Sequence, residues 1–258
     1  MTDATTTPPA SPPASPSGHR KGWIIGGVLA ALVVAAGVAV WYFVFRDTAP
    51  PPVNIERASE SVDTKPNGTN ATSSPDGTWT IDPSVGSFSD FTSSFVGYRV
   101  NEELAGVGAK TASGRTPEVS GTLVIDGGSA TTVDITADLT TLQSDESFRD
   151  NAMRDQALQT STFPDATFTL TEPISLGDVP AEGQTVKVDA TGGLTLHGVT
   201  KEVKIPLEAK LVKGVVVVTG QIDIPFADYD IEKPVAARVL SIEDHGIMEL
   251  QLFFTKQP

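Results

Sequence analysis

The 258-residue chain contains no cysteine and only three histidines. Without cysteine there are no disulfides, no thiolate nucleophile, no cysteine-based zinc site and no lipid-modified N-terminal cysteine. A three-histidine metal site would need His19, His197 and His245 together, but an apolar run separates His19 from the other two. We therefore predict no metal site and no cofactor.

Short catalytic motifs are also missing. The sequence holds no Gly-x-Ser-x-Gly elbow, no glycine-rich phosphate loop and no His-Glu-x-x-His pair. Acidic residues are plentiful, but a sequence does not show which carboxylates face a common cleft. We predict no catalytic residues and a protein that is not an enzyme.

Basic residues are scarce: 18 Lys and Arg stand against 32 Asp and Glu, for a net charge of −14. A chain this acidic is repelled by phosphate backbones, so nucleic acid is not an expected partner. It also avoids anionic lipid surfaces unless something holds it there.

The N-terminal part is divided by composition. Residues 1–21 are rich in Pro, Ser and Thr and predict a disordered tail. Residues 22–45 carry no charge over 24 positions, and a helix of that length spans about 36 Å, enough to cross a membrane. Trp23 and Trp41-Tyr42 suit the two interfaces. A cleaved signal peptide is the alternative, although the apolar residues continue to Phe45.

Charge around this predicted transmembrane helix sets its orientation. His19, Arg20 and Lys21 precede it, so the positive-inside rule places the N-terminus in the cytoplasm and the C-terminal domain outside the cell membrane. Small residues on the helix could support a weak homodimer. Residues 46–77 are rich in Pro, Ser, Thr and Asn and predict a flexible stalk.

Residues 78–258 alternate apolar and polar positions in many short runs, as half-buried antiparallel strands do. The clearest run has Val203, Ile205, Leu207, Ala209 and Leu211 on one face. Only the stretch 145–158 breaks the alternation, and it predicts one short helix. Seven to nine strands with one helix indicate an all-β sandwich or closed barrel.

Three blocks of this domain resemble the YceI-like family. The first is Gly192–Val203, which reads GGLTLHGVTKEV. The second runs from Ser144-Asp145 through Arg149-Asp150 to Phe163-Pro164, and the third combines Trp79–Asp82 with Gly121–Asp126. The family's usual histidines near the first two strands are missing here, so no role of those histidines can be transferred.

This resemblance implies an antiparallel, lipocalin-like, eight-stranded β-barrel whose lumen binds an isoprenoid or similar amphiphilic lipid, for transport or storage at the cell envelope. Two alternatives remain open. One is a ligand-free envelope stress or interaction module, and the other is an enzyme that modifies a lipid headgroup with His197 and carboxylates.

Candidate site residues follow from the resemblance and from the inward phase of the strands. His197 has a second interpretation, which we favour, as a turn residue bonded to backbone. The lumen candidates are Phe95, Val100, Leu123, Phe148, Met153, Phe168 and Leu196. The headgroup candidates are Arg99, Arg149, Arg154 and His197.

Overall fold

The computed structural model describes residues 32–39, 41–42, 46, 49–62, 75–177 and 181–257. Its contacts separate two units, Met1–Arg46 and Asp47–Pro258. In the first unit, residues 32–39 and 41–42 are helical and exposed. Within the described residues, no helix has the length and apolarity needed to cross a membrane. The predicted tail 1–21 and much of the predicted span 22–45 lie outside the described residues.

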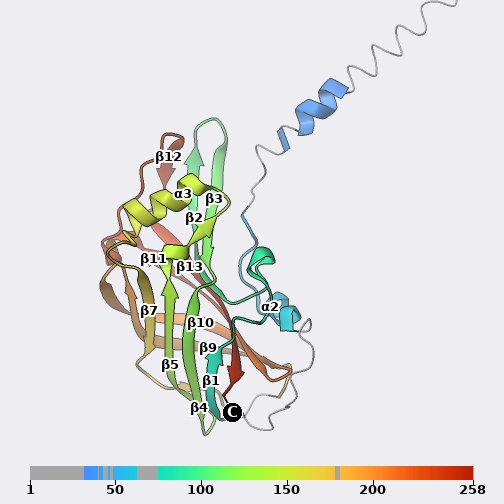
Figure 1. Cartoon of the computed structure of the whole chain (residues 1–258), viewed down its shortest axis with the longest axis vertical. Helices are drawn as coiled ribbons and strands as arrows, with labels where there is room; N and C mark the ends of the chain where they lie inside the picture. Colours follow the sequence, from blue (N-terminus) through green and yellow to red (C-terminus); the bar gives the residue numbers. More distant parts are fainter. Residues whose placement is uncertain are drawn as a thin grey trace, which may run out of the picture. The chain divides into compact units, whose positions relative to one another are not determined.

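The second unit is built almost entirely from strands (Figure 1). The strands are β1 (Gly77–Ile81), β2 (Phe95–Leu104), β3 (Gly108–Thr116), β4 (Val119–Asp126), β5 (Ser129–Asp138), β6 (Gln143–Ser144), β7 (Asp165–Leu170), β8 (Ile174–Ser175), β9 (Thr185–Leu196), β10 (Val199–Val212), β11 (Val215–Pro225), β12 (Val239–Ile242) and β13 (His245–Lys256). The helical elements are α2 (Ile55–Val62), α3 (Ser147–Ala152), a π-helical turn η3 (Met153–Ala157) and the short 3-10 turns η1 (Phe88–Asp90), η2 (Leu139–Thr141) and η4 (Phe226–Tyr229).

Eight strands close into a barrel. Antiparallel pairing runs in the order β1-β4-β5-β7-β9-β10-β11-β13, and β13 pairs back with β1. The predicted all-β, eight-stranded antiparallel barrel is thereby confirmed. Closure satisfies the backbone groups that an open sheet leaves unpaired at its edges.

The barrel forks at β13. The end of β13 pairs with β1, whereas its Ile247–Gln251 part pairs with β2. Strand β2 then pairs with β3 and β12, and β3 pairs with β6. The β2–β3 hairpin and β12 form the upper end in Figure 1, where α3 also lies.

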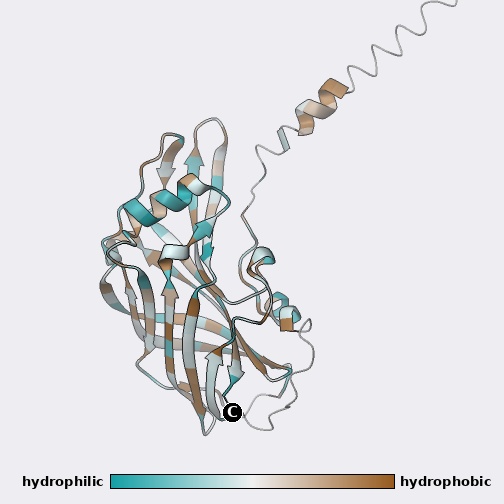
Figure 2. Cartoon of the chain, viewed as in Figure 1, coloured by the Kyte–Doolittle hydropathy of each residue, from teal (hydrophilic) through white to brown (hydrophobic). Residues whose placement is uncertain are grey.

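Alternation along the strands fills the interior with apolar side chains, and Figure 2 shows hydrophobic and hydrophilic residues interleaved on most strands. The core includes Trp79, Ile205, Leu252 and Phe254, all buried. Gly192 sits at an inward position where a Cβ would come within 2.5 Å of the Phe168 ring. Glycine there lets that ring approach the backbone of β9 closely.

The predicted helix 145–158 exists, but it is divided into α3 and the π-helical turn η3. Glu146 occupies the N-cap position of α3. Just before it, the backbone N–H and the hydroxyl of Ser144 both donate to Asp150 Oδ1, at 2.7 and 2.6 Å. Asp150 therefore fixes the loop that enters the helix.

Residues 49–62, which we call the strap, fall within the predicted flexible stalk but contain the helix α2. Asn54 Oδ1 accepts from the backbone N–H groups of Glu56 and Arg57, each at 3.1 Å, as a helix cap does. Ile55, Ala58 and Val62 of α2 are buried in a small cluster with Val85, from the loop after β1, and with three residues of β11 and β13, namely Val215, Val217 and Phe253. This part of the stalk is thus a packed element, because one side of it is apolar at helical spacing.

Candidate functional site

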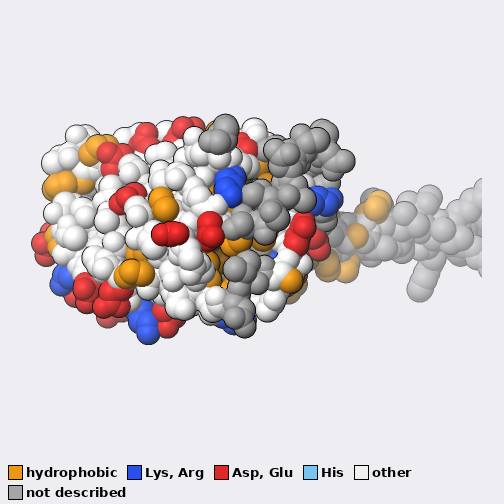
Figure 3. All heavy atoms as spheres, turned by 90° about the horizontal axis from the view of Figure 1, so that it is seen from below, with side chains coloured by type: hydrophobic (Ala, Val, Ile, Leu, Met, Phe, Trp, Pro, Cys, Tyr) orange, Lys and Arg blue, Asp and Glu red, His pale blue; other side chains and the backbone are white. Residues whose placement is uncertain are grey.

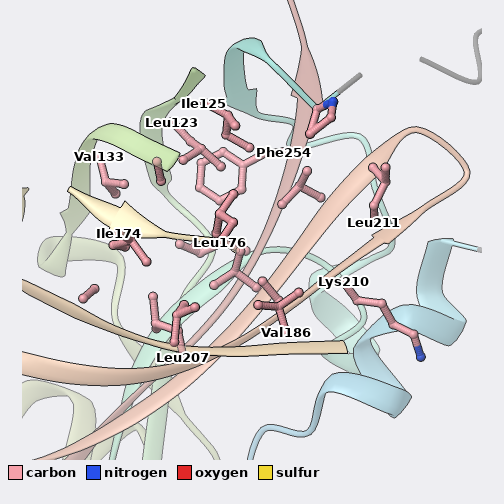
Figure 4. Close-up of a pocket in the computed structure, with 18 of the residues that line it drawn as sticks. Leu123, Ile125, Val133, Ile174, Leu176, Val186, Leu207, Lys210, Leu211 and Phe254 are labelled. Atoms are coloured by element: carbon pink, nitrogen blue, oxygen red, sulfur yellow. The ribbon is translucent and has the colours of Figure 1, made fainter. Parts of the chain in front are cut away.

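The lower half of the barrel encloses an apolar cavity of about 130 Å³. Leu123, Val133, Ile174 and Leu207 point into it from β4, β5, β8 and β10 (Figure 4). Lys210 is the only charged residue of the wall, and its Nζ is 2.7 Å from Glu56 Oε2 on α2. The ammonium group points away from the cavity in Figure 4, so an occupant would meet hydrocarbon almost everywhere.

A second cavity of about 120 Å³ lies in the upper half. Its wall combines apolar residues of β2, η2, η3 and β13 with four polar ones, Tyr98, Glu102, Arg149 and Glu232. Arg149 Nη2 donates to Glu102 Oε1 at 3.0 Å, and its Nη1 donates to Asp145 Oδ1 at 2.5 Å. Two carboxylates therefore already neutralise this guanidinium.

Burial alters the acidity of these polar groups. It raises the pKa of the Tyr98 hydroxyl well above its ordinary value. Burial alone would lower the pKa of Arg149, but the hydrogen bond and attraction from Glu102 outweigh it, and the pKa is raised. At neutral pH the upper cavity thus presents a neutral phenol and a paired guanidinium.

A layer of side chains separates the two cavities. Along the inward face of β9, Ala190 lines the lower cavity and Leu196 lines the upper one, whereas Leu194 between them lines neither. Leu194 is 3% exposed. The two cavities are therefore arranged along the barrel with a packed partition between them.

Five of the seven lumen candidates line a cavity. Leu123 and Phe168 line the lower one, and Val100, Met153 and Leu196 line the upper one. The prediction for Phe95 is wrong, because its ring is buried outside both cavities, 4.2 Å from the Arg115 guanidinium.

The prediction for Phe148 is also wrong. This side chain is 86% exposed on α3. The residues that this region contributes to the cavity wall are instead Arg149 of α3 and Met153 of η3. Helical spacing had suggested the inward face for Phe148, but the six-residue α3 buries none of its side chains fully.

Only one of the four headgroup candidates, Arg149, lines a cavity. Arg99 lies on the outer face and donates to the Pro50 carbonyl at 2.6 Å. Arg154 donates to the Leu142 carbonyl at 2.8 Å and does not line either cavity. These two guanidinium groups hold the backbone and are not available to a ligand in the lumen.

His197 is a buried turn residue, as we favoured from the sequence. Its φ is 51°, its Nδ1 is 2.9 Å from the Tyr229 carbonyl, and its ring meets Phe163 edge-on. It lines neither cavity. Among the described residues, no group of His, Asp and Glu side chains is arranged to hold a metal ion.

Tyr98 and Glu102 were missed by the sequence analysis. Both share the inward phase of β2 with Val96 and Val100, so the alternation itself could have identified them. They were missed because a polar residue in an alternating run is normally assigned to the wet face.

A further missed feature is a buried ion pair on the outer face of β13. Glu249 is fully buried, and Arg115 donates to its Oε1 through Nη2 at 2.7 Å and Nε at 2.8 Å. Burial is the main cause that lowers the pKa of Arg115, and the attraction of Glu249 opposes this shift. The strap covers the pair, because the Pro51 carbonyl accepts from Arg115 at 3.2 Å.

A closed antiparallel barrel with an apolar interior belongs to a class that either fills its lumen with side chains or holds one slender ligand. The sequence profile of the YceI-like domain matches residues 79–254. The chain therefore belongs to the YceI-like family.

Two curated relatives match shorter stretches. A UPF0312 protein of Pectobacterium atrosepticum is 38% identical over 102 residues, which are 39% of this chain and 44% of the relative. Protein YceI of Escherichia coli O157:H7 is 34% identical over 116 residues, which are 44% of this chain and 56% of the relative. The chain thus spans about half the length of the curated relatives it matches.

A solved structure supports the fold. A polyisoprenoid binding domain from Saccharophagus degradans, described as implicated in plant cell wall breakdown, superimposes with a TM-score of 0.52. Its identity to this chain is 22%, and the match covers 69% of this chain and 98% of that domain.

Proposed function

We propose that the barrel binds an isoprenoid or similar amphiphilic lipid with its hydrocarbon chain in the lumen. The observation that carries this proposal is the pair of mainly apolar cavities along the barrel axis. The wall of the lower cavity contains only one charged residue, Lys210. The structural similarity to a domain described as polyisoprenoid binding supports the same ligand class.

Burial of hydrocarbon would supply the affinity. Each buried methylene is worth about 0.8 kcal/mol, so one five-carbon isoprene unit contributes up to about 4 kcal/mol. An apolar protein cavity of ~150 Å³ takes a benzene molecule. Each cavity here, at about 130 and 120 Å³, therefore matches about one isoprene unit, and a longer chain must displace the partition at Leu194.

The polar groups give the ligand a direction. The tail belongs in the lower cavity, and the headgroup belongs beside Tyr98, Glu102 and Arg149 in the upper one. Because Glu102 and Asp145 already pair with Arg149, a phosphate or diphosphate would meet excess negative charge. The favoured headgroup is an uncharged hydroxyl or carbonyl, which can accept from the neutral Tyr98 hydroxyl.

The anchoring of the chain belongs to the same proposal. The uncharged run 22–45 holds the barrel at the outer face of the cell membrane, with the N-terminus in the cytoplasm. The protein then receives, stores or passes on a membrane lipid without chemical change. A weak homodimer through the helix is compatible with this role.

The test is binding of geranylgeraniol by the full chain in mild detergent, followed by native mass spectrometry. Ala190 is 1% exposed and lines the lower cavity, so Ala190→Phe should fill it and lower the bound fraction at least tenfold. The matched control is Ala109→Phe on the exposed surface of β3, which should bind like the unaltered chain.

Two results would contradict the proposal. If the unaltered chain binds no geranylgeraniol and releases no amphiphile after purification, the barrel is a ligand-free interaction module. If Ala190→Phe and Ala109→Phe bind equally, the ligand lies outside the lumen.

A further inference from the structure

Large hydrophobic side chains are exposed at only three described positions of the barrel unit. These are Phe148, Val235 and Leu240, with 86%, 83% and 67% of their surface exposed. Isolated exposed hydrophobic residues are common on soluble domains, but a group of them at one place marks a contact surface. We call these three residues the rim.

The rim lies around the upper cavity. Phe148 directly precedes Arg149, Val235 directly follows Pro234, and Leu240 stands two residues before Ile242. Those three neighbours all line the upper cavity. The segments that carry Phe148 and Leu240 both contact β2. Arg149 of α3 pairs with Glu102 of β2, and Glu102 is opposite Ile242 in the β2–β12 ladder.

Figure 1 places α3 and β12 at the same end of the barrel as the β2–β3 hairpin. The view from below shows a different surface, on which the described hydrophobic side chains form small separate areas among acidic and neutral ones (Figure 3). Among the described residues of the barrel unit, the large hydrophobic side chains that are exposed thus belong to segments whose neighbours line the upper cavity.

We propose that the rim docks the upper end of the barrel onto the surface of a lipid bilayer. This proposal rests on the proposed function, because a rim continuous with an apolar cavity gives a membrane lipid a path that avoids water. Exposed aromatic and aliphatic side chains insert into the membrane interface between the lipid headgroups and the acyl chains.

The strap supports this orientation independently of the rim. Its first residues are fastened to β2, where Arg99 donates to the Pro50 carbonyl, and Arg99 is three residues from Glu102 at the rim end. At ~3.3 Å per residue, this separation is about 10 Å. Five residue steps connect Phe45 to Pro50, and an extended chain of that length reaches at most ~18 Å. Under the proposed membrane span 22–45, this short connection would tie the barrel to the bilayer through a point about 10 Å along β2 from Glu102.

Charge predicts which bilayer is preferred. Residues 145–155 contain four acidic and two basic residues, and residues 230–245 contain another four acidic and two basic residues. In these two segments together, eight acidic residues outnumber four basic ones. An anionic surface would repel this end of the barrel. Docking should be strongest on zwitterionic lipid and weaker when anionic lipid is added.

The absence of cysteine allows a clean experiment on the full chain. Glu103→Cys at the rim end and Asp126→Cys in the β4–β5 turn would each carry a nitrobenzoxadiazole label, and both native side chains are exposed. The chain is reconstituted in phosphatidylcholine vesicles containing nitroxide-labelled lipid and no prenol. We expect quenching of the Glu103 label at least fivefold above that of the Asp126 label.

A rim variant identifies the side chains responsible. Phe148→Ser, Val235→Ser and Leu240→Ser together should reduce quenching at Glu103→Cys to the Asp126 value, while the melting temperature stays unchanged because all three side chains are exposed. Replacing a third of the lipid by phosphatidylglycerol should also reduce quenching at Glu103→Cys.

Equal quenching at the two labels, or no effect of the rim variant, would overturn docking. Docking would also be overturned if the protein associates with itself in a concentration-dependent manner and the rim variant abolishes this association, because the rim would then pair two copies of the chain. Because the vesicles contain no prenol, quenching with no geranylgeraniol binding in detergent would leave docking standing and remove the proposed function. The reverse pattern would remove docking alone.

Discussion

Leu194 separates the two cavities, and its removal should join them. Leu194→Ala deletes a side chain that is 3% exposed and stands on β9 between Ala190 of the lower cavity and Leu196 of the upper one. A buried Leu→Ala change costs about 2–5 kcal/mol, because hydrocarbon contacts are lost and a cavity remains. For a domain of this size, each kcal/mol lowers the melting temperature by about 2–4 °C, so we expect a loss of roughly 4–20 °C.

The same change should favour long ligands. In the unaltered barrel, an isoprenoid chain that passes from one cavity to the other must push Leu194 aside. With alanine the passage already exists, and one additional buried isoprene unit is worth up to about 4 kcal/mol. Even a third of that gain is a tenfold increase in affinity. Dimethylallyl alcohol, which is a single isoprene unit and fits within one cavity, should gain little, whereas geranylgeraniol should gain at least tenfold.

Affinity for dimethylallyl alcohol, farnesol and geranylgeraniol, measured by calorimetry on the full chain in detergent, would test this reasoning. Val217→Ala is the control, because Val217 is fully buried on the outer face against α2 and lines neither cavity. It should lower the melting temperature and leave the dependence on chain length unchanged. An identical chain-length dependence in Leu194→Ala and the unaltered chain would refute the partition.

Two further predictions concern the outer face and the upper cavity. Glu249→Gln should cost about 3–5 kcal/mol in urea unfolding, because the buried Arg115 keeps its charge but loses its carboxylate partner. Glu208→Gln in the more exposed pair with Lys187 should cost under about 1 kcal/mol, and equal losses would contradict this reasoning. Tyr98 has a pKa raised by burial, so the stability that it contributes is present below about pH 10, the ordinary pKa of an unfolded tyrosine, and is lost as the pH rises further. Melting temperatures between pH 8 and 11 should therefore fall more steeply for the unaltered chain than for Tyr98→Phe, and parallel curves would argue against a buried phenol.

The strands could be predicted because their signal is local. Val203, Ile205 and Leu207 alternate with polar residues, and a strand with one buried face requires that period wherever it pairs. The inward phase of β10 is therefore visible without a structure. Closure of the sheet by β1 and β13 is a contact between residues far apart in sequence, and only the family resemblance anticipated it.

The strap was missed because composition was given more weight than spacing. Its Pro-rich start and the Thr- and Asn-rich residues after it are typical of a linker. Yet Ile55, Ala58 and Val62 recur at intervals of three and four, as the apolar side of a helix does. Eight residues give too little periodicity to decide alone, and the outer face that the strap covers is a product of the tertiary fold.

In strand β2, a shift of one residue in the alternation between inward and outward side chains changes which side chains line the lumen. Phe95 and Val100 were both predicted to face the lumen, but positions separated by five residues lie on opposite faces of a regular strand. The pairing of Val96 with Leu250 fixes the phase: Val96, Tyr98 and Val100 face inward, and Phe95 and Arg99 face outward. The outer positions then meet Glu249 and the strap, which is why guanidinium groups from this region stabilise the attachment of the N-terminal segment. Under the proposed function, a headgroup in the lumen would meet Tyr98 and not the outward guanidinium of Arg99, so the phase of this strand favours a neutral over an anionic ligand.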